Sequence, residues 1–394
     1  MGDHDPQWIH DQIFESSQIL PLKELVVRVI DCGNPSLRIG SLSNLRKICI
    51  EHSSLGLSLP QKFTDQLSTL ISQCPNLTHL EINCGYISIE GLFQAINADN
   101  TKPPLSIEHL SLMKVEVTPA GFELALRHLK ALKYFRLLEN STKFGGLYGD
   151  NANIWAILHR EKLILSTIFT DRLEPEGLGL YLQAFHGLEN LYVRRPLASL
   201  LSPLGLLQIV SLHHSISLVE LDIDMTHSCD HWTWPFDEAS ISTLSSFPNL
   251  KLFGVTFCSR LSYIHGQESI VRASVVSALF FYILRFFWTL LPQKTLLDVG
   301  IKNFPKLQRV VIHMVPLRVA ARSLFQYSPL ERPEWLFCDV HEAIQAHSIE
   351  YHGIESMPVI ECQSVVYYAS RNLVTGVRSY VPSHPIMFED DLDR

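Results

Sequence analysis

A short apolar phrase recurs along this chain and constrains its fold more than any other feature of the sequence. The phrase is L-x-x-L-x-L, in which Ile, Val or Phe can replace Leu, and it is clearest where Leu77, Leu80 and Ile82 supply the apolar positions. The last two apolar residues are two positions apart, so they lie on the same face of a short strand. Further copies start at Leu22, Leu45, Ile107, Leu132, Leu188, Leu218, Leu250 and Leu307, and a degenerate copy comprises Ile164, Thr167 and Phe169.

The spacing of the copies is that of a repeat protein with irregular units. The first apolar position recurs after 23 residues between Leu22 and Leu45 and after 32 residues between Leu45 and Leu77, whereas leucine-rich repeats span roughly 20–29 residues. The step from Leu250 to Leu307 is 57 residues, and we expect one unrecognised repeat inside it. Between the copies, apolar residues recur at helical spacing, which predicts helices between the strands.

A strand followed by a helix cannot close a core by itself, but stacked copies bury a continuous one. The sequence therefore predicts an α/β fold, an irregular leucine-rich-repeat solenoid, in which parallel strands line the concave face and helices cover the convex face. We place this solenoid at residues 20–329. The flanking segments are an N-terminal polar or helical cap (residues 1–19), a C-terminal capping segment (residues 330–384) and an acidic disordered tail (residues 385–394).

Composition and charge indicate the cellular compartment and exclude some classes of partner. The net charge of −8 gives no general attraction for nucleic acid or for an anionic membrane surface. The eight cysteines include no C-x-x-C pair, which favours free thiols in a reducing compartment over a disulfide framework. We therefore expect a cytoplasmic protein, with the nucleus as the alternative compartment, and neither nucleic acid nor a membrane as its partner.

One apolar segment, residues 270–291, is long enough to cross a bilayer. Arg272 and Arg285 interrupt it and leave an uncharged stretch of only twelve residues, from Ala273 to Leu284. An arginine near the bilayer centre costs about 2.5–3.5 kcal/mol. We therefore expect a buried core helix here rather than a membrane span.

Several phrases of the sequence resemble the fungal F-box/leucine-rich-repeat-type proteins. These phrases are residues 181–191, 217–223, 232–236 and 241–250. In that family the repeats hold a substrate and the F-box docks on the Skp1 adaptor of a ubiquitin ligase, so the resemblance implies a protein client and a Skp1-type adaptor as partners. An F-box opens with an L-P-x-E-I-L-like helix, but the nearest candidate here, residues 20–27, fits the first strand of the repeat array better.

Motifs that specify catalysis are missing from the sequence. It contains no G-x-S-x-G, no H-E-x-x-H and no G-x-x-x-x-G-K-[ST]. Cys229 lies between His227 and His231, but zinc ligands usually come as two pairs at turn-compatible spacing, so we interpret this segment as a polar loop. We therefore expect no enzymatic activity, no cofactor and no metal.

The variable x positions of the phrase point away from the core and offer a surface for recognition. Aromatic residues and arginine often dominate the binding energy of protein interfaces, so we expect a protein partner on the concave face. The predicted contact residues are His79, His109, Tyr134, Arg136, Tyr192 and Glu220. In this interpretation the chain is a non-catalytic interaction module, such as a substrate-recognition adaptor of a ubiquitin ligase. The alternative is a hydrolase or transferase whose site lies in the insertions at residues 142–150 and 225–237.

Overall fold

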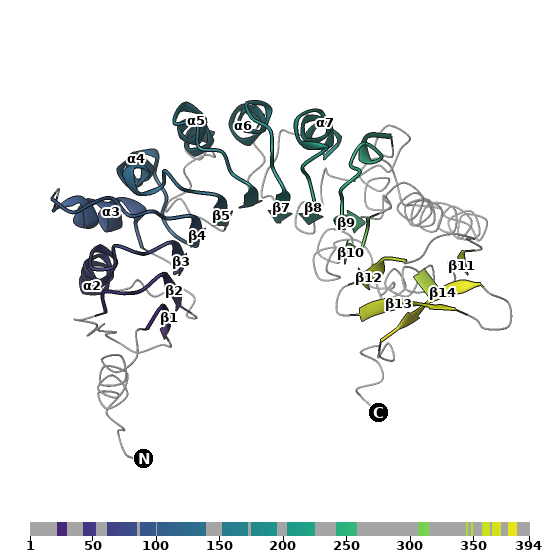
Figure 1. Cartoon of the computed structure of the whole chain (residues 1–394), viewed down its shortest axis with the longest axis horizontal. Coiled ribbons are helices and arrows are strands. Elements are labelled where there is room, and N and C mark those ends of the chain that lie inside the picture. Colours follow the sequence, from purple (N-terminus) through teal and green to yellow (C-terminus); the bar gives the residue numbers. More distant parts are fainter. Residues whose placement is uncertain are drawn as a thin grey trace, which may run out of the picture. The chain divides into compact units, whose positions relative to one another are not determined.

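Parallel strands alternate with helices in the computed structural model (Figure 1). The structure describes residues 22–29, 42–52, 61–84, 87–99, 101–138, 152–171, 175–194, 203–224, 242–257, 306–314, 344–345, 348–349, 357–362, 365–371 and 377–383. The chain forms two compact units, Met1–Phe185 (unit 1) and His186–Arg394 (unit 2). This division falls inside the segment predicted as one solenoid.

Some of the expectations fall on residues that the structure does not describe. They are the N-terminal cap (residues 1–19), the acidic tail (residues 385–394), the apolar segment 270–291 and the insertions at residues 142–150 and 225–237. Within the described residues, no helix combines the length and the apolar character that a membrane crossing requires.

The described residues of unit 1 form six strands, and from β1 to β6 each strand is hydrogen-bonded in parallel to the next one in the sequence. They are β1 (Glu24–Val29), β2 (Lys47–His52), β3 (His79–Asn83), β4 (His109–Met113), β5 (Tyr134–Leu138) and β6 (Thr167–Thr170). Equivalent positions of the repeated phrase are paired, so that Ile48, Leu80, Leu110 and Phe135 lie in one row. The predicted α/β class and the predicted strands are thereby confirmed.

Helices cover one face of these strands (Figure 1). They are α2 (Gln61–Ser72), α3 (Ile89–Asn97), α4 (Pro119–Ala125) with the 3-10 turn η1 (Leu126–His128), α5 (Ala152–Arg160), and the π-helical turn η2 (Pro175–Gly179) that leads into α6 (Leu180–Gln183). Helix α4 begins where the Thr118 hydroxyl accepts the Gly121 N–H at 3.0 Å. Gly121 also lets α3 and α4 approach, because a Cβ there would lie 2.8 Å from the backbone nitrogen of Glu90.

The apolar residues of the phrase form the core between strands and helices. Leu77, Leu80 and Ile82 are buried, as are their counterparts in the copies that start at Leu45, Ile107 and Leu132. The degenerate copy was predicted one residue out of register. Ile164 is 58% exposed, whereas Leu165, Ile168 and Thr170 are fully buried. The error arose because isoleucine and leucine are adjacent at this point, and apolar character alone does not decide which of them faces the core.

Unit 2 continues the same strand pattern and then reverses direction. The strands β7 (Asn190–Arg194), β8 (Glu220–Asp224), β9 (Leu252–Phe257), β10 (Arg309–Met314) and β12 (Val359–Cys362) pair in parallel. From β12 onward, β13 (Val365–Arg371), β14 (Arg378–Pro382) and β11 (Ser348–Ile349) are antiparallel. Helix α7 (Pro203–His214) lies between β7 and β8 in the sequence. These last strands form the segment that was predicted as a C-terminal cap.

One expectation about unit 2 is wrong. The 57-residue step from Leu250 to Leu307 was expected to contain another repeat. Strand β9 instead pairs directly with β10, and Phe253 lies beside Val310 in the register. The long step is therefore a long connection between neighbouring strands, because chain length between two copies does not fix the number of strands between them.

A matched pair of substitutions tests which leucines form the core of unit 2. Leu221 on β8 is fully buried, whereas Leu212 near the end of α7 is 76% exposed. Leu221→Asp buries an unpaired carboxylate and should lower the free energy of unfolding by more than about 3 kcal/mol. Leu212→Asp should cost less than about 1 kcal/mol. Urea denaturation followed by circular dichroism measures both, and equal losses would contradict the assignment of the core.

Candidate functional site

The face of the unit 1 strands opposite the helices carries a row of stacked rings; we call this face the polar face. His79, His109 and Tyr134 occupy equivalent positions on β3, β4 and β5. The ring centroids of His79 and His109 are 5.2 Å apart, and those of His109 and Tyr134 are 3.7 Å apart with an interplanar angle of 7°. Three of the predicted contact residues therefore form one continuous, half-buried row.

A second row on the polar face lies two residues further along each strand. It contains Cys49, Glu81, Ser111, Arg136 and Phe169. The guanidinium of Arg136 lies over the ring of Phe169, 4.8 Å from its centroid, and its Nη2 donates to the sulfur of Met113 at 3.6 Å. Arg136, a predicted contact residue, is thus held in place beside the stacked rings.

Burial and neighbouring charges set the protonation of this face. Lys47 and Glu81 form an ion pair at 3.0 Å, and the hydrogen bond and charge of Glu81 raise the pKa of Lys47. Burial lowers the pKa of His109 to about 4 despite the nearby Glu81, so its imidazole is neutral at neutral pH. Burial, reinforced by Glu81 and Glu51, raises the pKa of the Cys49 thiol to about 11. This cysteine is therefore protonated and a poor nucleophile.

Arg136 has different neighbours from the other basic side chains on this face. In the described part of the chain, Arg28 pairs with Glu51, Lys47 with Glu81 and Lys133 with Glu108. The groups in contact with Arg136 are instead an aromatic ring and a thioether, and its Nε lacks a hydrogen-bond partner. None of the described carboxylates neutralises this half-buried guanidinium, so its charge can still attract an anionic group.

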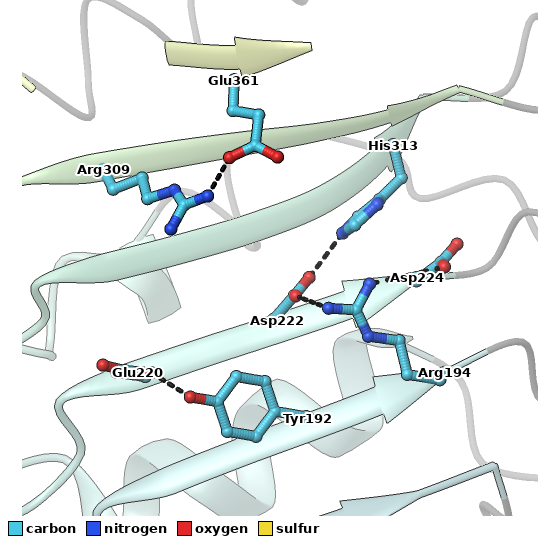
Figure 2. Close-up of polar contacts among 8 residues, drawn as sticks. All are labelled: Tyr192, Arg194, Glu220, Asp222, Asp224, Arg309, His313 and Glu361. Atoms are coloured by element: carbon cyan, nitrogen blue, oxygen red, sulfur yellow. Dashed lines mark hydrogen bonds and ion pairs between the residues drawn. The ribbon is translucent and has the colours of Figure 1, made fainter. Parts of the chain in front are cut away.

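The two predicted contact residues of unit 2 lie together and contact each other. The phenol of Tyr192 on β7 donates to the carboxylate of Glu220 on β8 (Figure 2). One row further on, Arg194 contacts both Asp222 (Nη2–Oδ2, 2.6 Å) and Asp224 (Nη1–Oδ2, 3.6 Å). Acidic and basic side chains thus link β7 to β8.

Asp222 also reaches a strand that is not its neighbour. Its Oδ1 lies 2.6 Å from Nε2 of His313 on β10, although β9 lies between β8 and β10 (Figure 2). The residue of β9 that faces Asp222 is Gly254, and a Cβ there would lie 2.0 Å from that same Oδ1. Because Gly254 has no side chain, the carboxylate of Asp222 on β8 can reach across β9 to His313 on β10.

Sequence reasoning placed the six contact residues on strand faces but missed several of their neighbours. Phe169 was assigned to the core by the register error in the degenerate copy. His313 and the ion pair between Arg309 and Glu361 were missed, although Arg309 is an x position of the copy that starts at Leu307. The x position of Arg309 in the repeated phrase could have indicated that its side chain lies on the polar side of the strand. Its contact with Glu361, however, depends on the order of the strands in the sheet.

Comparison of the sequence with models of known protein families and with curated proteins gave no match.

The neutral His109 predicts a pH-dependent stability. Because its pKa falls from 6.5 to about 4 on folding, the unfolded chain binds a proton in that interval that the folded chain does not. The free energy of unfolding should therefore decrease as the pH falls through this window, by at most about 1.4 kcal/mol per pH unit from this group, and be unaffected by it at higher pH. His109→Gln should flatten the profile measured by urea denaturation. An unchanged slope would show that His109 is protonated in the folded state.

The contact between Gly254 and Asp222 predicts that the two positions depend on each other. Gly254→Ala should displace the Asp222 carboxylate from Arg194 and His313 and lower the free energy of unfolding by roughly 1–3 kcal/mol. In an Asp222→Ala background the same change should cost much less, because the obstructing atoms are gone. A double-mutant cycle of melting curves measures this coupling, and additive effects of the two changes would argue against the contact.

Proposed function

We propose that this chain is an irregular leucine-rich-repeat solenoid that binds a protein partner on its polar face and catalyses no reaction. Several observations support the solenoid. The apolar positions of the repeated phrase are buried, consecutive strands pair in parallel and in register, and helices cover one face of the strands of unit 1. In such an array the polar face is the concave one.

The observation that carries the binding proposal is the state of Arg136. Its guanidinium lies over the ring of Phe169, beside the stacked rings of His109 and Tyr134, and none of the described carboxylates pairs with it. Tyrosine and arginine that are held rigidly lose little entropy on binding, and they are frequent among the residues that dominate interface energies. We infer that the partner places an acidic side chain on Arg136 and an apolar or aromatic one against Tyr134.

The cellular role that we propose is that of an adaptor in the cytoplasm, or alternatively in the nucleus. The resemblance to fungal F-box/leucine-rich-repeat-type proteins supports the recognition of a client protein for a ubiquitin ligase, with a Skp1-type adaptor as a further partner. The candidate F-box segment at residues 20–27 overlaps β1 (Glu24–Val29), so a contact with that adaptor would have to involve other residues.

A quantitative pull-down from a fungal cell lysate tests the binding face. Tyr134→Ala combined with Arg136→Ala should reduce recovery of the partner at least tenfold, which corresponds to about 1.4 kcal/mol. The fold should survive, because both side chains lie outside the core, and a melting curve checks this.

The matched control removes an ion pair from the helix side of unit 1. Glu123 and Arg160 are paired at 3.1 Å on α4 and α5, and their side chains are about half exposed. Glu123→Ala with Arg160→Ala should leave partner recovery unchanged. Loss of binding in this control, with recovery intact in the Tyr134 and Arg136 variant, would place the interface on the helices instead.

A further inference from the structure

In the part of unit 1 that the structure describes, the parallel sheet ends at the outer edge of β1. Among the described strands, β1 pairs with β2 alone. The carbonyl of Lys23 accepts hydrogen bonds from the N–H groups of Arg46 and Lys47, so the odd-numbered residues of this strand turn their backbone groups toward β2. Because successive residues of a strand alternate, Glu24, Val26 and Arg28 direct their N–H and C=O groups to the outer edge.

The side chains of β1 are covered less well than those of the next strand. Leu25 and Val27 are half-buried, whereas their neighbours in the register, Ile48 and Ile50, are fully buried. On the other face of the strand, Val26 is 53% exposed. An edge strand of six residues with incompletely covered apolar side chains is a template for the addition of another strand.

We propose that two copies of this chain associate through β1, with the two strands antiparallel about a twofold axis at Val26. Only residues whose N–H and C=O groups point to the outer edge can form hydrogen-bonded pairs with the second copy. The even-numbered residues of β1 must therefore pair with even-numbered residues of its partner strand. With Val26 opposite Val26 of the second copy, Glu24 lies opposite Arg28, and Arg28 opposite Glu24. Leu25 lies opposite Val27, so the half-buried apolar residues cover each other.

The charged residues of β1 favour this register, and they favour a second copy of the chain as the partner. Arg28 also pairs with Glu51 of its own chain at 2.8 Å. A shift by two residues places Arg28 opposite Val26, so that no acidic residue of one copy faces a basic residue of the other. In the proposed register each acidic residue faces a basic one, and opposite charges directly across two antiparallel strands stabilise the pair whereas like charges destabilise it. The strand is therefore complementary to itself, as a twofold interface requires.

A charge-swap experiment on the full chain tests the pairing. Analytical ultracentrifugation of the wild type should show a dimer that dissociates on dilution. In Glu24→Arg every facing pair is basic, and in Arg28→Glu every facing pair is acidic, so each variant alone should dimerise more weakly, by roughly tenfold or more in Kd. Mixed together, the two variants should form a heterodimer about as tight as the wild-type dimer, because each Arg then faces a Glu.

The outcomes separate the proposal from a simple loss of structure. A variant in which β1 had merely detached would not be rescued by mixing. A wild type that is monomeric at all concentrations, single variants that dimerise like the wild type, or a mixture without heterodimers would each overturn the proposal.

A crosslink tests the position of the twofold axis. Directly opposed residues of a hydrogen-bonded antiparallel pair have Cα atoms about 5.5 Å apart, a separation that a disulfide spans. Val26→Cys should therefore oxidise to a covalent dimer on a non-reducing gel. Ile164→Cys, at an equally exposed position of unit 1, is the matched control and should remain a monomer. Equal crosslinking of both variants would contradict the axis at Val26.

Discussion

The in-register hydrogen bonding between consecutive parallel strands is the interaction on which the rest of the structure depends. It places equivalent positions of successive copies side by side, so that Leu80 meets Leu110 and His79 meets His109. Neighbouring strands are about 4.8 Å apart, and every side chain is therefore in contact range of its counterpart in the next copy. The core and the polar face are two consequences of this one constraint.

On the polar face, in-register pairing places side chains of similar type in ordered rows. Aromatic and imidazole rings in one row stack because their spacing is close to the thickness of a ring, and the stack removes water from His109. That desolvation keeps the histidine uncharged, which in turn allows it to pack closely against Tyr134. In the row beside it, the ring of Phe169 supplies a support for Arg136. These contacts hold the rings and the guanidinium against one another.

The repeated phrase was enough to predict the α/β class, most of the strands and the side of each strand that faces the core. It was enough because burial of alternate residues leaves a strong pattern, as at Leu77, Leu80 and Ile82. It failed where that pattern is ambiguous, at Ile164 and Leu165, and where a long connection resembles an extra repeat, between β9 and β10. The contacts of Asp222 could not be predicted, because they depend on which strands are neighbours and on an empty position between them. Sequence periodicity predicts where strands lie and which of their residues are buried. The partners of a polar side chain depend on the order of the strands in the sheet.

The narrow space at Gly254 has a consequence for how this sequence can diverge. An aspartate at position 222 and a residue with a side chain at position 254 compete for the same volume, so neither site can change freely while the other stays as it is. Related chains that keep the acidic residue should keep the glycine, and chains with a larger residue at 254 should carry a smaller one at 222. Evolution along this strand face would therefore proceed by paired replacements, and His313, which loses its carboxylate in the second case, would be released to vary.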